Sequence, residues 1–314
     1  MTISGALSSI PADPIAVVCH DAGAANHIFA WIRKGIVKGK EPLRIYLEGP
    51  AKHIWQNLFP NVNEYHIADS LDDALLDARS LIVGSGWGSN LEYNALEIAL
   101  RRGIPSAGVV DHWVNYLERF KRNGVSHLPS EIWVTDPYAC LIATKKFPQR
   151  PIRQIENVYL ENLVFEIKIE QQKINYGTKP TILYALEPAR SNWGRNDKNG
   201  EFQGLDYFIS NIEHLGLGQN PQLLLRPHPS DEPGKYDAWI ATHQFTHICL
   251  DPKQSLAQAI AIADCVVGLN SYALVIALAA GKKVFSTIPP WGPACVLPHP
   301  EIIHLRDIVG NADR

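Results

Sequence analysis

The chain has 314 residues, of which 46% are hydrophobic and 19% charged, so it can bury a large core. Its length favours two domains over one. The formal net charge is −3 at pH 7, and Lys and Arg are spread along the chain without a basic block, so we expect no binding to nucleic acid.

Strand and helix candidates alternate along the first half of the chain. Gly103 is well placed to end one of the helices. Apolar runs predict strands at 15–20, 43–49, 62–68, 80–86, 104–112 and 131–136. Periodic segments predict helices at 24–36, 51–59, 70–78, 90–103 and 137–147. The pattern then loosens through the polar stretch 158–179.

A second alternating series follows this stretch. It predicts strands at 180–188, 221–229, 247–251, 264–270 and 282–289, and helices at 205–216, 235–243, 255–263 and 271–281. Two such series predict an α/β fold of two doubly wound parallel-sheet (Rossmann-like) domains facing across a cleft. We place the first domain at 1–165 and the second at 166–314. Such sheets bind ligands at the carboxyl ends of their strands, so the residues there are the candidates for function.

The segment "LLLRPHPSD" places polar side chains directly after a predicted strand. Arg226 and His228 follow this strand, and prolines fix the backbone on both sides of the histidine. This rigidity directs a guanidinium and an imidazole outward from the end of the sheet. The alternative is a turn with a solvated histidine.

The segment "GLNSYALVIALAAG" joins a predicted strand to a helix that opens near Ser271, a natural N-cap residue. Gly268, Asn270 and Ser271 lie at this junction. A helix start with free N–H groups and a nearby hydroxyl is suited to a nucleotide diphosphate. Simple capping of the helix is the alternative.

Taken together and in this order, "RPHPSD", "SLAQAIAIAD", "CVVG" and "NSYALVIALAAGKKV" resemble the C-terminal domain of GT-B-type proteins. That superfamily includes sugar-nucleotide glycosyltransferases and the non-hydrolysing UDP-N-acetylglucosamine 2-epimerases. The resemblance is clearest over about residues 180–290 and implies a GT-B-like fold. It also implies a nucleotide-sugar donor as co-substrate, without a further cofactor.

The resemblance implies roles for several residues of the second domain. Asn270, Ser271 and Tyr272 would contact the donor's phosphates, and the "RPHPS" residues Arg226, His228 and Ser230 would contact the pyrophosphate or the departing nucleotide. By position alone, Glu187 and Arg190 would lie in a loop that closes on the donor. One departure is that Val275 and Ala277 stand where the family's helix often carries a ribose-binding glutamate.

Three predicted strand ends of the first domain collect polar residues. His20 and Asp21 follow the first strand, residues 85–90 follow the fourth, and "DHWVNYLERF" from Asp111 follows the fifth. Mixtures of aromatic and hydrogen-bonding groups commonly hold sugars. The alternative for the last segment is an aromatic helix capped by Asp111, and we expect core packing for Trp113, Tyr116 and Phe120.

Glycosyl transfer needs a base for the acceptor hydroxyl and groups that stabilise the leaving diphosphate. We expect Asp111 or His20 to be the base, with Asp21 orienting His20, because a carboxylate beside an imidazole fixes its tautomer and raises its basicity. His112, next to Asp111, is a further candidate. Arg226, His228 and the helix start at Ser271 would stabilise the leaving group.

The expected function is therefore a metal-independent glycosyltransferase, in surface-polysaccharide biosynthesis with a glycan or lipid-linked acceptor. One alternative is an epimerase or hydrolase of the same fold. Another is a non-catalytic nucleotide-sugar or glycan-binding protein, an alternative supported by the lack of the ribose-binding glutamate. No DxD follows an apolar strand and no HExxH or GxSxG occurs, which argues against a metal site and a serine hydrolase. Five scattered cysteines, no signal-peptide pattern and no transmembrane window predict a cytoplasmic protein.

Overall fold

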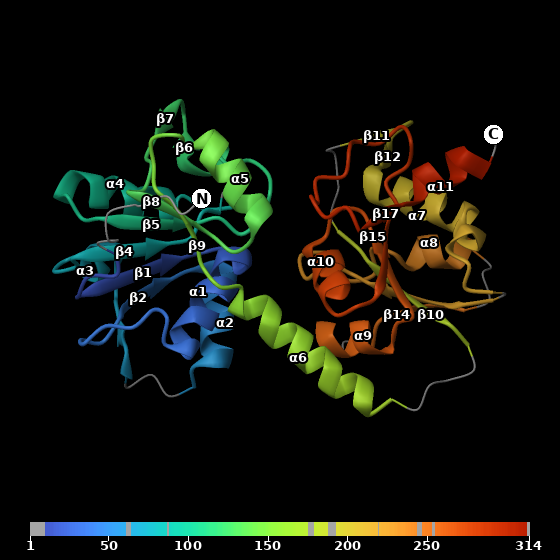
Figure 1. The fold of residues 1–314 in the computed structure, drawn as a ribbon, viewed down its shortest axis with the longest axis horizontal. Coiled ribbons are helices and arrows are strands. Elements are labelled where there is room, and N and C mark those ends of the chain that lie inside the picture. Colours follow the sequence, from blue (N-terminus) through green and yellow to red (C-terminus); the bar gives the residue numbers. More distant parts are fainter. Residues whose placement is uncertain are drawn as a thin grey trace. The chain divides into compact units, whose positions relative to one another are not determined.

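The computed structural model describes residues 10–60, 64–86, 88–174, 179–187, 193–218, 220–243, 247–252 and 255–312. It divides the chain into two compact units, Met1–Tyr159 and Leu160–Arg314. Each unit contains one large sheet flanked by helices and one two-stranded hairpin, with the first unit in blue to green and the second in yellow to red (Figure 1).

The first unit contains a seven-stranded sheet in the order β3-β2-β1-β4-β5-β8-β9. Every neighbouring pair of these strands is parallel. The strands are β1 (Ile15–Cys19), β2 (Arg44–Leu47), β3 (His66–Ile67), β4 (Ser80–Val83), β5 (Ser106–Val109), β8 (Glu131–Val134) and β9 (Ile152–Gln154). The central strands are buried along their whole length, which explains their nearly continuous apolar sequences. The strand order reverses between β1 and β4, so the switch point, where such sheets bind ligands, lies at their carboxyl ends.

The helices of the first unit pack their apolar residues on this sheet. In α1, Ile28, Phe29 and Trp31 are fully buried in the core around β1. Gly103 has a left-handed backbone and ends α4, as expected from the sequence. The helices are α1 (Ala22–Lys34), α2 (Gly49–Leu58), α3 (Leu71–Ala74), α4 (Leu91–Arg102) and α5 (Pro137–Lys146).

The segment after β5 differs from the aromatic helix considered above. It contains a short 3-10 helix at Glu118–Phe120 and a hairpin of β6 (Lys121–Arg122) and β7 (Val125–Ser126). Asn123 and Gly124 at the hairpin turn both have positive φ, as a tight two-residue turn requires. Asp111 therefore caps no helix at this position.

A helix, α6 (Val158–Gln172), occupies most of the stretch in which the sequence pattern loosens (yellow-green in Figure 1). Its apolar residues do not form one stripe: Ile167 is buried, whereas Phe165 and Ile169 are exposed. Without a single apolar face, the helical period is hard to recognise. The division between the units falls in its first turn, and the predicted boundary after residue 165 falls within the same helix.

The second unit contains a six-stranded sheet in the order β14-β13-β10-β15-β16-β17, also with parallel neighbours. The strands are β10 (Thr181–Ala185), β13 (Gln222–Arg226), β14 (Ile248–Leu250), β15 (Cys265–Gly268), β16 (Lys283–Ser286) and β17 (Ile303–His304). In chain order this is the 3-2-1-4-5-6 arrangement of doubly wound folds, with its switch point between β10 and β15.

The remaining elements of the second unit flank this sheet. They are α7 (Gly200–Ser210), α8 (Asp237–Thr242), α9 (Leu256–Ile262), α10 (Tyr272–Ala279), α11 (Leu305–Ala312), a 3-10 helix at Ile212–Leu215, and the hairpin of β11 (Gly194–Arg195) and β12 (Lys198–Asn199). The prediction of two parallel-sheet α/β halves is confirmed. The described residues contain no helix that could span a membrane.

Candidate functional site

The two residues that follow β1 form a hydrogen-bonded pair at the switch point of the first sheet. His20 Nδ1 lies 2.7 Å from Asp21 Oδ1, and their side chains are 20% and 34% exposed. If Nδ1 carries the ring proton, it donates to the carboxylate and leaves Nε2 as an acceptor. The structure thus places Asp21 where it can orient His20.

Glycines make room for this pair. A Cβ on Gly49, at the start of α2, would lie 2.5 Å from His20 Nε2, and a Cβ on Gly86 would lie 1.8 Å from Asp21 Oδ2. Real side-chain atoms do not approach this closely, so these positions must lack a Cβ if both side chains are to keep their places. The small residues after β2 and β4 are therefore part of the site's geometry.

Glu92, in the first turn of α4, supports the same strand end from inside the protein. Its Oε1 accepts the backbone N–H of His20 at 2.7 Å, and the residue is 2% exposed. Its Oε2 has no hydrogen-bond partner among the described residues. Burial raises the pKa of Glu92, and the nearby Asp21 charge acts in the same direction. The sequence reasoning missed this residue, because a glutamate at a helix start ordinarily reads as a surface charge that favours the helix dipole.

Asp111, after β5, is held by a buried arginine. Arg119 Nη1 donates to Asp111 Oδ1 at 2.6 Å and to the Ser85 hydroxyl at 3.2 Å, and Arg119 is 7% exposed. A Cβ on Gly23 would lie 1.7 Å from Asp111 Oδ2, so this carboxylate lies against the first turn of α1. Burial acts to raise the pKa of Asp111, but the Arg119 charge and those of nearby histidines outweigh it and lower the pKa. A carboxylate with a lowered pKa is a weak base.

The aromatic residues after Asp111 belong mainly to the core. Trp113, Tyr116 and Phe120 are 7%, 2% and 1% exposed, which confirms the expected core packing. The Trp113 ring lies 5.2 Å from the ring of His112, and its Nε1 donates to both oxygens of Asp136 at 3.1 Å. His112, one of the predicted bases, therefore packs beside the core.

In the second unit, Arg226 ends β13 and forms an ion pair with Asp251, which follows β14. The Asp251 side chain is 2% exposed, whereas that of Arg226 is 26% exposed. Because one partner is buried and the other reaches solvent, the pair fixes the guanidinium at the sheet end while leaving part of it accessible.

His228 is held in a defined tautomer by the turn that follows. Its Nδ1 accepts the backbone N–H of Ser230 at 3.2 Å and lies 2.8 Å from the Ser230 hydroxyl. A neutral His228 whose Nδ1 accepts must carry its proton on Nε2, which then serves as a donor. Asp231 Oδ2 accepts the His228 backbone N–H at 3.0 Å, so the backbone of the turn is fixed as well.

Charged side chains inside the protein stabilise this turn. Lys235 Nζ lies 2.6 Å from Asp231 Oδ1 and 3.0 Å from Glu201 Oε1, and both carboxylate side chains are 1% exposed. Tyr236 donates its hydroxyl to Asp231 at 3.0 Å. The sequence reasoning missed these positioning residues, because Glu201 lies far away along the chain, on α7.

The junction of β15 and α10 contains Gly268 as the last strand residue, Asn270 and Ser271 in the turn, and Tyr272 at the first helical position. Ser271 is the N-cap of α10 and accepts the Ala273 N–H at 3.2 Å, as the capping interpretation predicts. A Cβ on Gly268 would lie 2.8 Å from the Ala185 carbonyl oxygen. The Asn270 side chain accepts the Val296 N–H at 2.9 Å and so ties this turn to a later segment.

Glu187 follows β10 and contacts the same turn. Its Oε2 accepts the backbone N–H of Asn270 at 3.0 Å. Burial raises the pKa of Glu187 to about 7, and the Glu201 charge also raises it, while the Asn270 hydrogen bond lowers it. The predicted contact Arg190 lies outside the described residues.

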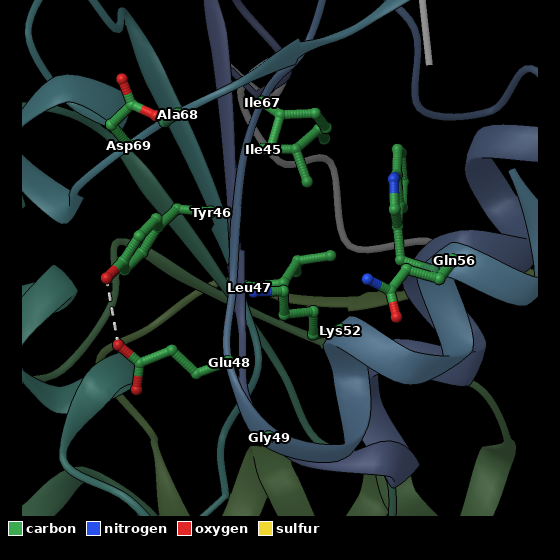
Figure 2. A pocket seen from close by; sticks show the side chains of 11 residues that line it. Ile45, Tyr46, Leu47, Glu48, Gly49, Lys52, Gln56, Ile67, Ala68 and Asp69 are labelled. Atoms are coloured by element: carbon green, nitrogen blue, oxygen red, sulfur yellow. Dashed lines mark hydrogen bonds between the residues drawn. The ribbon is translucent and has the colours of Figure 1, made fainter. Parts of the chain in front are cut away.

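A pocket of about 590 Å³ lies in the first unit beside the carboxyl end of β2 (Figure 2). Tyr46 donates its hydroxyl to Glu48 at 3.1 Å along one side of it. Gly49, where an added Cβ would meet the His20 ring, is part of the wall. The full lining is Ile45, Tyr46, Leu47, Glu48, Gly49, Lys52, Trp55, Gln56, Ile67, Ala68 and Asp69. In the part of the chain that the structure describes, no group of His, Cys, Asp and Glu is arranged to hold a metal ion.

Comparison with known proteins gives similarity in structure but not in sequence. No protein family's sequence profile matches the chain, and neither does any curated protein. The structure of a UDP-GlcNAc 2-epimerase from Neisseria meningitidis bound to UDP-GlcNAc is similar, with a TM-score of 0.63, 11% identity, and coverage of 95% of this chain and 90% of that chain.

Two further similar structures are a complex with UDP and a second UDP-N-acetylglucosamine 2-epimerase. The S. aureus MnaA–UDP structure has a TM-score of 0.59 at 10% identity and covers 87% of this chain and 78% of that one. A UDP-N-acetylglucosamine 2-epimerase from Rickettsia bellii has a TM-score of 0.54 at 12% identity, with the same coverages. Identities this low establish the shared fold alone, and the GT-B-like fold implied by the sequence is confirmed.

Proposed function

We propose that the protein is an enzyme that acts on a nucleotide sugar, and that its reaction is glycosyl transfer with His20 as the general base. The observation that carries this proposal is the His20–Asp21 pair at the switch point of the first sheet. A histidine hydrogen-bonded through Nδ1 to a carboxylate is a common arrangement for a general base.

His20 fits the role of base better than Asp111 does. Asp111 is already neutralised by Arg119, and its lowered pKa makes it a poor proton acceptor. Its role in this proposal is to hold Arg119 and the start of α1 in place. His20 Nε2 is the atom that would take the proton of the acceptor hydroxyl, while Nδ1–H remains bound to Asp21.

The strand ends of the second unit are proposed to bind the donor's diphosphate. Arg226 provides a cation and His228 an Nε2–H group, and the backbone of the Asn270 turn leads into the start of α10, with the Asn270 N–H bound by Glu187. Fixed donors of this kind stabilise negative charge as it grows on a leaving diphosphate. The similar structures, whose names include UDP and UDP-GlcNAc, support a nucleotide-sugar ligand.

Epimerisation of a nucleotide sugar is the second candidate, because the similar structures include UDP-GlcNAc 2-epimerases. An epimerase needs several carboxylates around the sugar ring. Near the strand ends of the first unit, Asp111 is paired with Arg119, Glu92 is buried, and Asp136 caps α5. Asp21, beside His20, and the exposed Glu48 and Asp69 after β2 and β3 remain accessible. The preference for transfer therefore rests on the oriented His20–Asp21 pair.

The test is a thermal-shift screen against UDP-, GDP-, CMP- and dTDP-sugars, followed by product analysis with the sugar that gives the largest shift. Transfer or hydrolysis releases free nucleotide, whereas epimerisation gives an isomeric nucleotide sugar without release. We expect release that is lost in His20→Ala and retained in the matched surface variant His53→Ala. The absence of a shift with every nucleotide sugar would contradict the proposal.

A further inference from the structure

The Glu187 carboxyl group already occupies a backbone donor of the turn proposed to bind phosphate. Its Oε2 accepts the Asn270 N–H at 3.0 Å. Glu187 and Asn270 come together because β10 and β15 are neighbouring strands, with Ala185 paired to Gly268. An internal acceptor therefore occupies one backbone N–H of the turn that is proposed to bind phosphate.

The groups around Glu187 favour its neutral form. Burial is the largest influence and, with the Glu201 charge on α7, raises its pKa to about 7. Lys235 pairs with Glu201 but also with Asp231. Its charge therefore does not fully cancel the influence of Glu201 on the pKa of Glu187. Among the described residues, Tyr184 on β10 also interacts with the Glu187 charge, and burial raises the pKa of Tyr184.

We infer that the ionised Glu187 carboxylate and the donor's diphosphate compete for the Asn270 N–H, so that the diphosphate binds only when Glu187 is protonated or displaced. Two anions cannot share one N–H at hydrogen-bonding distance without strong repulsion. A protonated carboxyl group removes this repulsion and can itself donate to a phosphate oxygen. Binding near neutral pH should then take up a proton. This inference rests on the proposed function of the turn.

The expected effect follows from the fraction of protein in which Glu187 is neutral. With the Glu187 pKa at about 7, that fraction falls about tenfold between pH 6 and pH 8, and the apparent affinity should fall by the same factor. Glu187→Gln keeps an oxygen acceptor for Asn270 but removes the charge. Its affinity should therefore match that of the wild type at pH 6 and stay nearly constant up to pH 8.

The experiment is isothermal titration of the full chain with UDP-GlcNAc, whose phosphodiesters do not titrate in this range. The proteins are the wild type, Glu187→Gln and the control Glu213→Gln, an exposed glutamate of the same unit. Titration of the wild type at pH 7 in buffers of different ionisation enthalpy gives the number of protons taken up, and this readout does not depend on any variant.

The inference predicts proton uptake by the wild type and the control, and none by Glu187→Gln. Binding of UDP-GlcNAc with equal pH profiles in wild type and Glu187→Gln would overturn the inference and leave the proposed function standing. Binding that is weaker in Glu187→Gln at both pH values would also overturn it, because Glu187 would then assist the ligand. Lack of binding by every protein at both pH values would overturn the inference together with a UDP-GlcNAc site.

Discussion

His20 Nδ1 and Asp21 Oδ1 lie 2.7 Å apart where the strand order of the first sheet reverses. If this pair is the general base, His20→Ala should lower turnover about 10²- to 10⁴-fold. Asp21→Asn should cause a smaller loss, because the imidazole remains but is no longer oriented. Initial rates of nucleotide release measure both, with His53→Ala as the control. Wild-type rates in His20→Ala would exclude it as the base.

The close approach of Gly49 to His20 gives a second prediction. A methyl group at position 49 would lie 2.5 Å from Nε2, so Gly49→Ala should displace the ring and reduce turnover about 100-fold. Gly49 also has a positive φ, which an alanine tolerates poorly. Gly103→Ala is the matched control, since Gly103 has a positive φ with nothing within 4 Å. Equal losses in both variants would mean that backbone strain, not the clash with His20, is responsible.

The Asp111–Arg119 pair predicts a loss of stability that depends on pH. Arg119→Met leaves Asp111 unpaired and should destabilise the first unit by up to about 3 kcal/mol. Because the pKa of Asp111 is lowered from 3.8, the pair stabilises the fold above that value and loses this contribution as the pH falls. The melting-temperature gap to wild type should therefore be wide at pH 7 and begin to close as the pH falls below the unfolded value of 3.8. A gap that is constant with pH, or as small as in the exposed Arg101→Met, would show that the charge pair is unimportant.

Much of this architecture could be predicted from the sequence because it depends on local signals. Buried parallel strands have continuous apolar sequences, so the polar residues at or after their carboxyl ends can be predicted: His20, Asp21, Arg226 and His228. The capping role of Ser271 and the end of α4 at Gly103 follow from residue type alone. Helix α6 lacks a single apolar face and was not predicted.

The partners of these residues could not be predicted, because they depend on which strands become neighbours. Glu92 binds the backbone of His20 across 72 positions of sequence, and Asp251 reaches Arg226 from the next strand of its sheet. Their carboxylates look like surface charges until the sheet order is known. The exposed polar residues of both candidate sites can therefore be predicted from the sequence. The buried residues that position them become identifiable only in the structure.

Glu92 gives a prediction of opposite sign to that of Asp111. Its pKa is raised above 4.5 by burial, so its ionisation costs the folded state stability as the pH rises from 4.5 toward the folded value. Glu92→Gln does not titrate and should gain in melting temperature relative to wild type over that interval. The melting temperature of Glu97→Gln, a change on the exposed side of the same helix, should vary with pH in parallel with that of the wild type. A parallel curve for Glu92→Gln would contradict the burial of an ionisable carboxyl group at this position.

The most direct test of the account is the binding of a nucleotide sugar at the strand ends of the second unit. Arg226→Lys keeps a positive charge for Asp251 but loses the guanidinium geometry, and Arg306→Lys is the matched control. Titration calorimetry at pH 6 with the nucleotide sugar selected by thermal shift should give binding to wild type and control. The affinity of Arg226→Lys should be about tenfold or more weaker, because a hydrogen bond to a charged group contributes about 1.5–3 kcal/mol. Equal affinity of Arg226→Lys and wild type, or no binding of any nucleotide sugar, would contradict the assignment of this site.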